Sequence, residues 1–397
     1  MSNKFGKYIG NEIKYIQQYL DTETLENKNY PWVQNFEQKF IELSNSEYAI
    51  AVNSATSGLH AALEACNLSP GDEVISPGLT VIMNAFTTLK SNLTPVFADV
   101  NKDTWCIDIE TIIPKVTAKT KVIMPVSLFG LPVDIKPIMD FAKERGIIVI
   151  DDSAETILGS YQGKFAGTHA DIAVYSFENK KHMTSGGEGG MVITSNEKLA
   201  EKIRKFAGIG YKNLSATAGR VSLAASEFQD PLYKRHDLIG INYRMTPLTA
   251  AIGIAQLERI DELVDRRIKI GNMFEEATKH CDWMISQSRI EDANHTYLTA
   301  GFKYLGLEKK GIPWKDFYNL YISKGGDGIY AAWMNPYLEA ALYGKKFNQT
   351  ECHENLCPNA EELQKKLMLF KTNYRDLSVA EDKAKILSNL IDEIGRN

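Results

Sequence analysis

Short apolar runs alternate with amphipathic stretches along the first half of the chain. The apolar runs have the length of buried strands, and the stretches between them show apolar residues three and four positions apart. This alternation predicts a mostly parallel sheet covered by helices on both faces. The predicted strands span 49–54, 72–78, 94–100, 121–130, 147–154, 171–177 and 189–195, and the predicted helices 8–20, 36–44, 57–66, 82–91, 134–145 and 197–206.

The pattern changes after Met245. Helical spacing of apolar residues continues to about residue 280, with Pro247 in the first turn where proline is tolerated, and this predicts one long helix. We therefore predict an α/β protein. Residues 1–245 would form an N-terminal arm and a three-layer α/β/α large domain with a mostly parallel mixed sheet. Residues 246–397 would form a linking helix and a smaller C-terminal α+β domain.

Composition restricts the classes of function. The 397 residues are 44% hydrophobic with a net charge of −5, which is typical of a soluble globular protein and gives no reason to expect nucleic acid. The first residues lack a signal-peptide pattern, and no run of about 18 apolar residues predicts a membrane span, so we expect a cytoplasmic protein. Cys352, His353 and Cys357 offer too few ligands for zinc, and we expect no metal.

Polar residues gather where several predicted strands end, which is where ligands bind in sheets of this kind. The segment 53–57 (NSATS) separates a strand from a helix, so backbone N–H groups with the hydroxyls of Thr56 and Ser57 could hold a phosphate. Ordinary helix capping by Ser54 explains the same residues, and taken alone it is the simpler interpretation.

Two adjacent acids, Asp151 and Asp152, follow another apolar strand. Successive side chains of a strand point to opposite faces, so only one acid can serve a given pocket. A buried carboxylate is costly unless a cation meets it. Facing a protonated pyridine nitrogen, it would turn that ring into an electron sink. A helix cap or a metal ligand remains an alternative for this motif by itself.

A lysine, Lys181, lies five residues after Ser176 in a loop between two predicted strands, followed by the flexible run 185–187 (SGG). A lysine amine can form a Schiff base with a cofactor aldehyde and then move a proton between two carbons. A solvated pair of Lys180 and Lys181 explains the same residues. The glycines lack the spacing of known nucleotide-binding loops.

Together, the three clusters occur in the order that pyridoxal phosphate requires, and here the chain resembles the sugar aminotransferase family called DegT/DnrJ/EryC1/StrS, fold type I pyridoxal-phosphate enzymes. The resemblance implies a cofactor that passes through pyridoxamine phosphate, glutamate or glutamine as amino donor, and a keto-sugar acceptor, most often nucleotide-linked. It also implies a homodimer with shared active sites. The matching motifs are FEQKFIELSNSEYAIAVNSATSGLHAAL, GDEVISPGLT, PVFADV, VIDDSAE, SFENKK, GINYRMTPLTAAIGIAQLERID and CPNAEEL.

The resemblance further implies individual roles. Lys181 would carry the cofactor and shuttle the proton, and Asp152 would pair with the pyridinium nitrogen. The remaining implied contacts are the cofactor phosphate for Thr56, Ser57 and Ser176, the ring face for Val81, the ring oxygen for Glu155, and the phosphate of the neighbouring subunit's cofactor for Asn242.

Four departures from the family pattern bear on these expectations. Val81 stands where an aromatic residue usually stacks on the ring, and Glu155 where Gln or His is usual. The segment 330–342 replaces one rich in His, Tyr and Pro that frames the sugar, and 368–376 (MLFKTNYRD) replaces a proline-containing ending. The last two leave a small phosphorylated ketone or a keto-cyclitol open as the acceptor.

The loop 213–236 shows little periodicity and is predicted to have a functional or interface role. Its neighbourhood carries basic side chains that could meet phosphates or could simply be solvated: Lys212, Arg220, Lys234 and Arg235.

His182 competes with Lys181 for the cofactor position. Dehydratase relatives carry histidine there and keep a free pyridoxamine cofactor. Counting forward from Ser176 in S-F-x-x-x-K selects Lys181, whereas counting backward from the 188–190 motif (EGG) selects His182, because one glycine is extra. A loop absorbs an inserted glycine easily, so we predict Lys181 and a transaminase. A pyridoxamine-dependent keto-sugar dehydratase remains the alternative.

Overall fold

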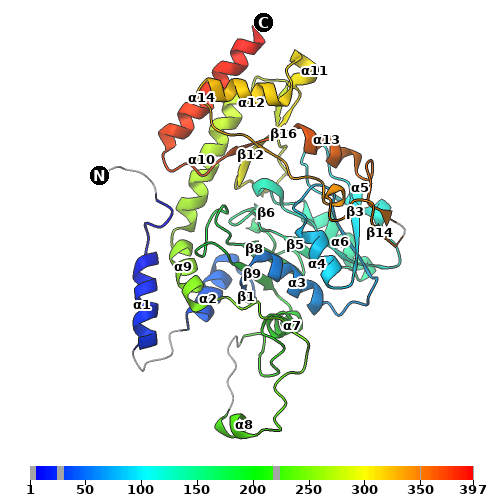
Figure 1. Cartoon of the computed structure of the whole chain (residues 1–397), viewed down its shortest axis with the longest axis vertical. Coiled ribbons are helices and arrows are strands. Elements are labelled where there is room, and N and C mark those ends of the chain that lie inside the picture. The colour runs from blue at the N-terminus through cyan, green and yellow to red at the C-terminus, as the bar shows by residue number, and fades with distance from the viewer. Residues whose placement is uncertain (1–5, 25–30, 218–223, 349, 397) are drawn as a thin grey trace.

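The computed structural model describes residues 6–24, 31–217, 224–348 and 350–396, and its centre is a seven-stranded sheet (Figure 1). The strand order is β1-β9-β8-β5-β4-β2-β3; β9 runs antiparallel to both of its neighbours and the other pairings are parallel. The strands are β1 (Tyr48–Val52), β2 (Glu73–Pro77), β3 (Thr94–Ala98), β4 (Thr120–Ile123), β5 (Ile148–Asp152), β8 (Ile172–Ser176) and β9 (Gly190–Thr194).

Helices cover both faces of this sheet. Helices α2 (Trp32–Ser44) and α9 (Pro247–Leu257) pack on one face, and α3 (Ala55–Ala65) and α7 (Glu197–Ala207) on the other, with α4 (Met83–Lys90) and α6 (Ile135–Arg145) beside β2–β5. The predicted three-layer α/β/α arrangement with a mostly parallel mixed sheet is confirmed.

The two-residue period of the strands sorts side chains between the layers. In β8, Ala173 and Tyr175 belong to the core under α2 and α9, whereas Val174 belongs to the core under α3. Helix α3 lies close to the sheet at Gly58, where an added Cβ would stand 2.9 Å from Val174 Cγ1 and 2.9 Å from Val192 Cγ2. The glycine thus sets how near the start of α3 comes to the strand ends.

Two predicted elements are shorter than expected. The strand predicted over 121–130 ends at Ile123, because Pro125 has no N–H to donate to a ladder; a 3₁₀ turn follows at Leu128–Gly130. The single helix predicted from residue 246 to about 280 is two helices, α9 and α10 (Ile260–Thr278). They are separated where Arg259 leaves the helical region with φ −124° and ψ 16°.

The C-terminal part is built on an antiparallel sheet of order β10-β12-β16-β13, with α10 and α14 (Leu377–Gly395) packed against each other. The predicted domain boundary at 245/246 stays a prediction. The remaining elements are β10 (Met284–Ser286), β12 (Thr299–Tyr304), β13 (Tyr330–Ala331), β16 (Leu367–Lys371), α5 (Ile109–Ile112), α11 (Gly306–Lys310), α12 (Trp314–Ser323), α13 (Pro358–Lys366), β6 (Ser160–Tyr161), β7 (Lys164–Phe165), β11 (Ala293–Asn294), β14 (Lys346–Phe347) and β15 (Thr350–Glu351).

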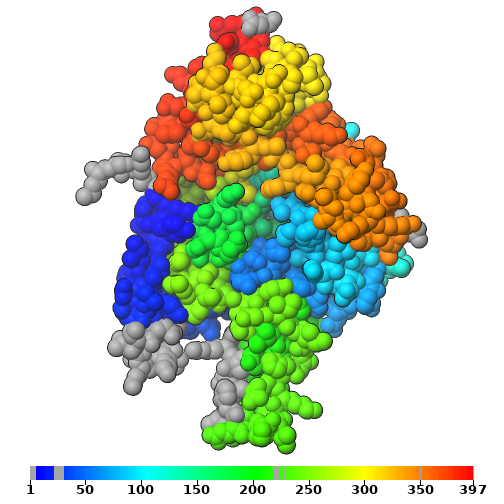
Figure 2. Space-filling model, viewed as in Figure 1, coloured from blue at the N-terminus to red at the C-terminus, as the bar shows by residue number. Residues whose placement is uncertain are grey.

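Two segments lie on the outside of the molecule. The N-terminal arm with α1 (Glu12–Thr24), blue in Figure 2, runs along α9, where Tyr15 donates to Glu258 Oε1 at 2.6 Å. Helix α8 (Ala225–Gln229), which belongs to the 213–236 loop, lies at the opposite end of the molecule to the C-terminus (Figure 1). Within the described ranges, no helix has both the length and the apolar character needed to cross a membrane.

Candidate active site

A cavity of about 560 Å³ opens between the sheet and the C-terminal part. On the sheet side, its walls come from residues at or just beyond the carboxyl ends of β1, β2, β4, β5 and β8, which is the edge where such sheets bind ligands. The opposite wall comes from α10, β12, β13 and β16 and the residues next to them. Among the lining residues are Ser54, Thr56, Thr80, Val81, Val126, Asp152, Glu155, Ser176, Lys180, Lys181, Arg267, Thr299, Tyr330, Trp333 and Lys371.

The fold brings six of the eight predicted site residues to this cavity, and these are Thr56, Val81, Asp152, Glu155, Ser176 and Lys181. The other two are outside its lining. Ser57 is buried in the first turn of α3, where its hydroxyl donates to Asn53 Oδ1 at 2.5 Å. Asn242 is exposed and forms an isolated bridge with Gly208. The roles predicted for all eight residues stay predictions.

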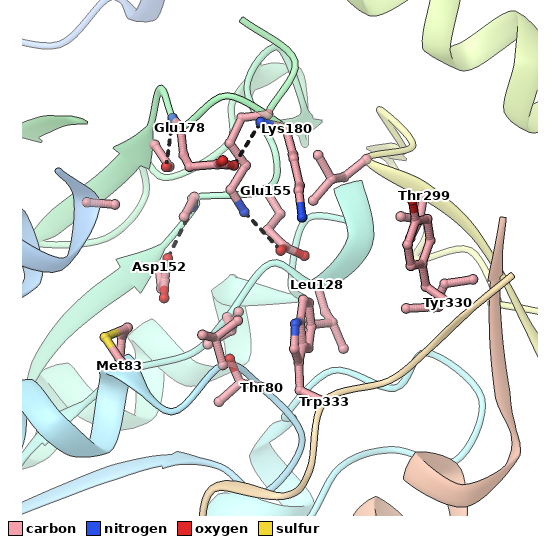
Figure 3. A pocket seen from close by; sticks show the side chains of 18 of the residues that line it. Thr80, Met83, Leu128, Asp152, Glu155, Glu178, Lys180, Thr299, Tyr330 and Trp333 are labelled. Carbon is pink, nitrogen blue, oxygen red and sulfur yellow. Dashed lines mark hydrogen bonds and ion pairs between the residues drawn. The ribbon is translucent and has the colours of Figure 1, made fainter. Parts of the chain in front are cut away.

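Lys181 extends its amine towards Glu155. The Lys181 Nζ lies 3.0 Å from Glu155 Oε1, and Glu155 Oε2 accepts the backbone N–H of Phe129 at 2.9 Å. In Figure 3, Asp152 and Glu155 approach the cavity from the sheet side, whereas Tyr330 and Trp333 approach from the other side. The reactive amine and a substrate-sized space are therefore adjacent.

The two neighbouring acids point to different surroundings, as the strand period predicts. Asp152 lines the cavity and accepts hydrogen bonds from Asn84 Nδ2 at 3.2 Å and the Ala154 N–H at 3.1 Å. Burial raises the pKa of Asp152 to about 6, although the Ala154 N–H, the charge of Lys181 and Asn84 act in the opposite direction. Asp151 is outside the lining, and burial together with Asp152 raises its pKa to about 7.

His182 is directed away from the cavity. It is 3% exposed, its Nε2 lies 3.0 Å from the carbonyl oxygen of Thr296, and it is absent from the cavity lining. Burial and then the charge of Arg267 lower the pKa of the imidazole well below its usual range. The structure therefore gives access to the cavity to Lys181 and not to its neighbour, in agreement with the forward count from Ser176.

Arg267 is a cavity residue that the sequence did not suggest. From α10 its guanidinium donates to the carbonyl oxygens of Lys180 at 2.8 Å, Lys181 at 3.0 Å and Leu298 at 2.9 Å, and to Thr372 Oγ1 at 3.1 Å. Burial lowers its pKa to about 10. It thus fixes the backbone of the lysine loop. The pair at 266–267 (RR) on an amphipathic helix is typical of a solvated face, so the sequence carried no signal.

Asn84, by contrast, had a readable signal. It is a polar residue within an apolar stretch (VIMNAF, 81–86), and such a residue needs a partner when buried. It is 1% exposed, and the partner is Asp152.

The cavity fits pyridoxal phosphate in three respects. The N-terminus of α3 presents backbone N–H groups beside Thr56 and Ser176, which suits a phosphate. A Cβ on Gly190 would stand 2.7 Å from Ala55 N, so glycine keeps this helix start close to β9. Within the described residues, the hydrogen-bond donors to Asp152 are uncharged, so its carboxylate could still pair with a protonated ring nitrogen.

The comparisons with known proteins agree with this site. The model of the DegT/DnrJ/EryC1/StrS aminotransferase family matches residues 7–369. The chain is 38% identical to GDP-perosamine synthase of Escherichia coli O157:H7, over 72% of this chain and 73% of that protein. It is 33% identical to the spore coat polysaccharide biosynthesis protein SpsC of Bacillus subtilis (strain 168), over 75% of this chain and 77% of the relative.

Among solved structures, an aminotransferase from Psychrobacter cryohalolentis superposes with a TM-score of 0.87 and 26% identity, over 98% of this chain and 99% of that one. These relatives do not favour the dehydratase alternative. The chain therefore belongs to the DegT/DnrJ/EryC1/StrS aminotransferase family and is a pyridoxal-phosphate-dependent aminotransferase.

Proposed function

We propose that this enzyme moves an amino group from glutamate or glutamine to a nucleotide-linked keto-sugar, with Lys181 as the residue that carries the cofactor. The observation that carries the proposal is the meeting of the Lys181 amine, the buried Asp152 carboxylate and the N-terminus of α3 in one cavity. The relatives named for GDP-perosamine and for spore coat polysaccharide support a role in cell-surface polysaccharide synthesis; secondary-metabolite synthesis is the other family role.

Each proposed contact follows from the position of the residue. The N–H groups at the start of α3, with Thr56 and Ser176, would bind the cofactor phosphate. Ser57 would belong to the same phosphate site, because it lies in the same first turn of α3. Asp152 would hold a proton on the ring nitrogen, and Val81 would cover one face of the ring. When bound, the cofactor supplies an aldehyde that accepts amino groups and a ring that withdraws electrons.

Lys181 would also move the proton between substrate and cofactor carbons. Its side chain lines the cavity, and its backbone carbonyl accepts a hydrogen bond from Arg267. The amine can therefore move while the backbone of Lys181 stays in place. The surrounding residues shield this amine from most of the bulk water, because the Lys181 side chain is only 17% exposed. Donor and acceptor use the same site in turn, and the kinetics should be ping-pong.

The acceptor would enter between the lysine loop and the 330–342 segment. Tyr330 and Trp333 supply aromatic surface there, and Lys180 and Lys371 supply positive charge, which together suit a sugar that carries phosphates. Asp327 lies 2.6 Å from Lys371 and offsets part of that charge. The similarity to GDP-perosamine synthase favours GDP as the nucleotide to test first.

A spectroscopic screen tests this proposal. The enzyme is converted to its pyridoxamine form with glutamate, and GDP-, UDP- and dTDP-linked keto-sugars are added separately. We expect the pyridoxamine absorbance to disappear fastest with a GDP-linked keto-sugar. Loss of absorbance only with a phosphorylated ketone or a keto-cyclitol, which are the alternative acceptors, would overturn the sugar-nucleotide assignment.

We propose a homodimer in which Asn242 of one subunit completes the site of the other. Its support is the exposed apolar side chains close to Asn242 in the chain, where Ile239 is 92% and Ile241 39% exposed. Mixing Lys181→Ala and Asn242→Ala proteins tests it. If each site uses both chains, an equal mixture that exchanges subunits regains about a quarter of the wild-type activity. No recovery on exchange would contradict a shared site.

Two proposals concern the setting of the enzyme. Lys212 Nζ lies 4.0 Å and Arg235 Cζ 5.9 Å from the centre of the Tyr233 ring, outside the cavity lining. With the exposed Lys234, they would meet phosphates only across a dimer interface. Arg220 lies outside the described residues.

All five cysteines are unpaired, which supports the cytoplasm as the compartment.

A further inference from the structure

Glu155 joins the wall of the cavity to the Lys181 amine. Its Oε2 accepts the Phe129 N–H at 2.9 Å, and its Oε1 lies 3.0 Å from Lys181 Nζ. Only 5% of the Glu155 side chain and 17% of the Lys181 side chain are exposed. Two opposite charges so far out of water attract each other much more strongly than a pair on the surface. The ion pair between Glu155 and Lys181 is therefore a structural feature of the site.

The N–H that fixes Glu155 comes from an unusual backbone. Phe129 is fully buried with φ 61° and ψ 11°, a left-handed conformation that costs a non-glycine residue about 1 kcal/mol or more. Its ring stacks on Trp333 at 5.6 Å between centroids and meets Trp105 edge-on at 6.3 Å. This packing holds the strained residue, and it also connects the acceptor side of the cavity to the Glu155 carboxylate.

We propose that Glu155 is a positioning residue for Lys181, whose free amine it holds as an ammonium ion against the cavity wall. The inference rests on the proposed function, in which Lys181 captures the cofactor. Among the described side chains, Glu155 is the one bonded to this amine. The amine has to leave this contact before it can attack a cofactor aldehyde, so Glu155 restrains capture of the cofactor by Lys181.

The cofactor-free protein gives the most direct test. Glu155→Gln removes the charge but keeps the shape, and glutamine is a residue that the family usually carries at this place. Trace acetylation from pH 6 to pH 10, followed by peptide mass analysis, measures the reactive fraction of Lys181. The amine has to leave its ion pair with the carboxylate before it reacts, so removal of the charge should speed labelling at pH 8 by about tenfold or more.

Glu178→Gln is the matched control. Glu178 lines the same cavity, but its Oε2 accepts the backbone N–H of Lys180 at 2.8 Å instead of touching the amine. We expect this variant to change the labelling of Lys181 by about twofold or less, because a carboxylate without direct contact is screened by solvent. An equal effect of both variants would overturn the proposal, because the charge of the cavity as a whole would then be responsible.

A second readout follows the absorbance change when pyridoxal phosphate is added to the cofactor-free proteins. Capture by Glu155→Gln should be faster than capture by the wild-type protein at pH 7. Identical pH profiles of labelling and capture in the two proteins would refute the role of Glu155. The proposed function fails separately, if the captured cofactor is found on a residue other than Lys181.

Discussion

Asp152→Asn should stabilise the cofactor-free protein at neutral pH, although it removes the partner proposed for the cofactor ring. Burial raises the pKa of Asp152 from 3.8 to about 6, so the folded chain holds this proton more tightly than the unfolded chain does. The stabilisation from the protonated form is complete below pH 3.8 and is lost as the pH rises through about 6. Wild type therefore loses the stabilisation from this acid over this range, whereas the variant has no such contribution from position 152 to lose.

The expected size of the effect follows from the same displacement. At about 1.4 kcal/mol per pKa unit, the rise in the pKa of Asp152 corresponds to about 3 kcal/mol of unfolding free energy. Because Asp152 titrates together with Asp151, we expect the variant to gain about 2–3 kcal/mol. The amide fits the site. It can still accept the Ala154 N–H, and Asn84 Oδ1, which has no hydrogen-bond partner in the described part of the chain, can accept from the new NH₂ group after a flip.

Urea unfolding of both cofactor-free proteins at pH 5 and pH 8 measures this prediction. The difference in unfolding free energy between variant and wild type should widen towards pH 8. Asp151→Asn is the matched control, because the pKa of Asp151 is also raised, to about 7, but this acid is outside the cavity. The difference in unfolding free energy between Asp151→Asn and wild type should also widen towards pH 8, but this variant should still bind the cofactor. A difference that is equal at pH 5 and pH 8 in Asp152→Asn would refute the reasoning.

Three further substitutions test the supports of the site. Gly58→Ala should cost about 1–3 kcal/mol in urea unfolding and weaken cofactor retention, because its Cβ would stand 2.9 Å from atoms of β8 and β9. Arg267→Lys should lower the unfolding free energy by about 2–4 kcal/mol, since one ammonium cannot replace a guanidinium that reaches four acceptors. Trp333→Ala should raise KM for the acceptor several-fold in steady-state assays. It should change unfolding by only about 1 kcal/mol, because Trp333 is 36% exposed. Unchanged values in these assays would contradict the corresponding contacts.

The sheet could be predicted from the sequence because its strands are buried on both faces. Their apolar runs placed the starts of all seven strands within one residue and the ends of all but β4 within two residues. The polar residues at the strand ends indicated where the cavity would lie. Pro125 indicates where the strand predicted over 121–130 has to end, but the apolar residues on both sides of it suggested a longer strand. The break between α9 and α10 could not be predicted, because the helical spacing of apolar residues continues across Arg259, whose backbone leaves the helical region.

Contacts between distant segments account for what the sequence could not predict in the site. The bonds from Arg267 to the lysine loop join residues more than 80 positions apart, and periodicity carries no information about them. The left-handed conformation of Phe129 is equally hidden, because only the surrounding packing maintains it. The prediction of Lys181 rather than His182 rests on spacing from Ser176, which lies at a strand end. It stays a prediction, and the place of Lys181 in the cavity lining supports it.

The central claim is that Lys181 carries the cofactor. Borohydride reduction of the enzyme with pyridoxal phosphate bound fixes the cofactor to the amine that holds it, and peptide mass mapping then locates the adduct. We predict the phosphopyridoxyl group on the Lys181 peptide of the wild-type protein and its absence from Lys181→Ala. An adduct on another lysine, or a cofactor that stays free after reduction, would contradict the account.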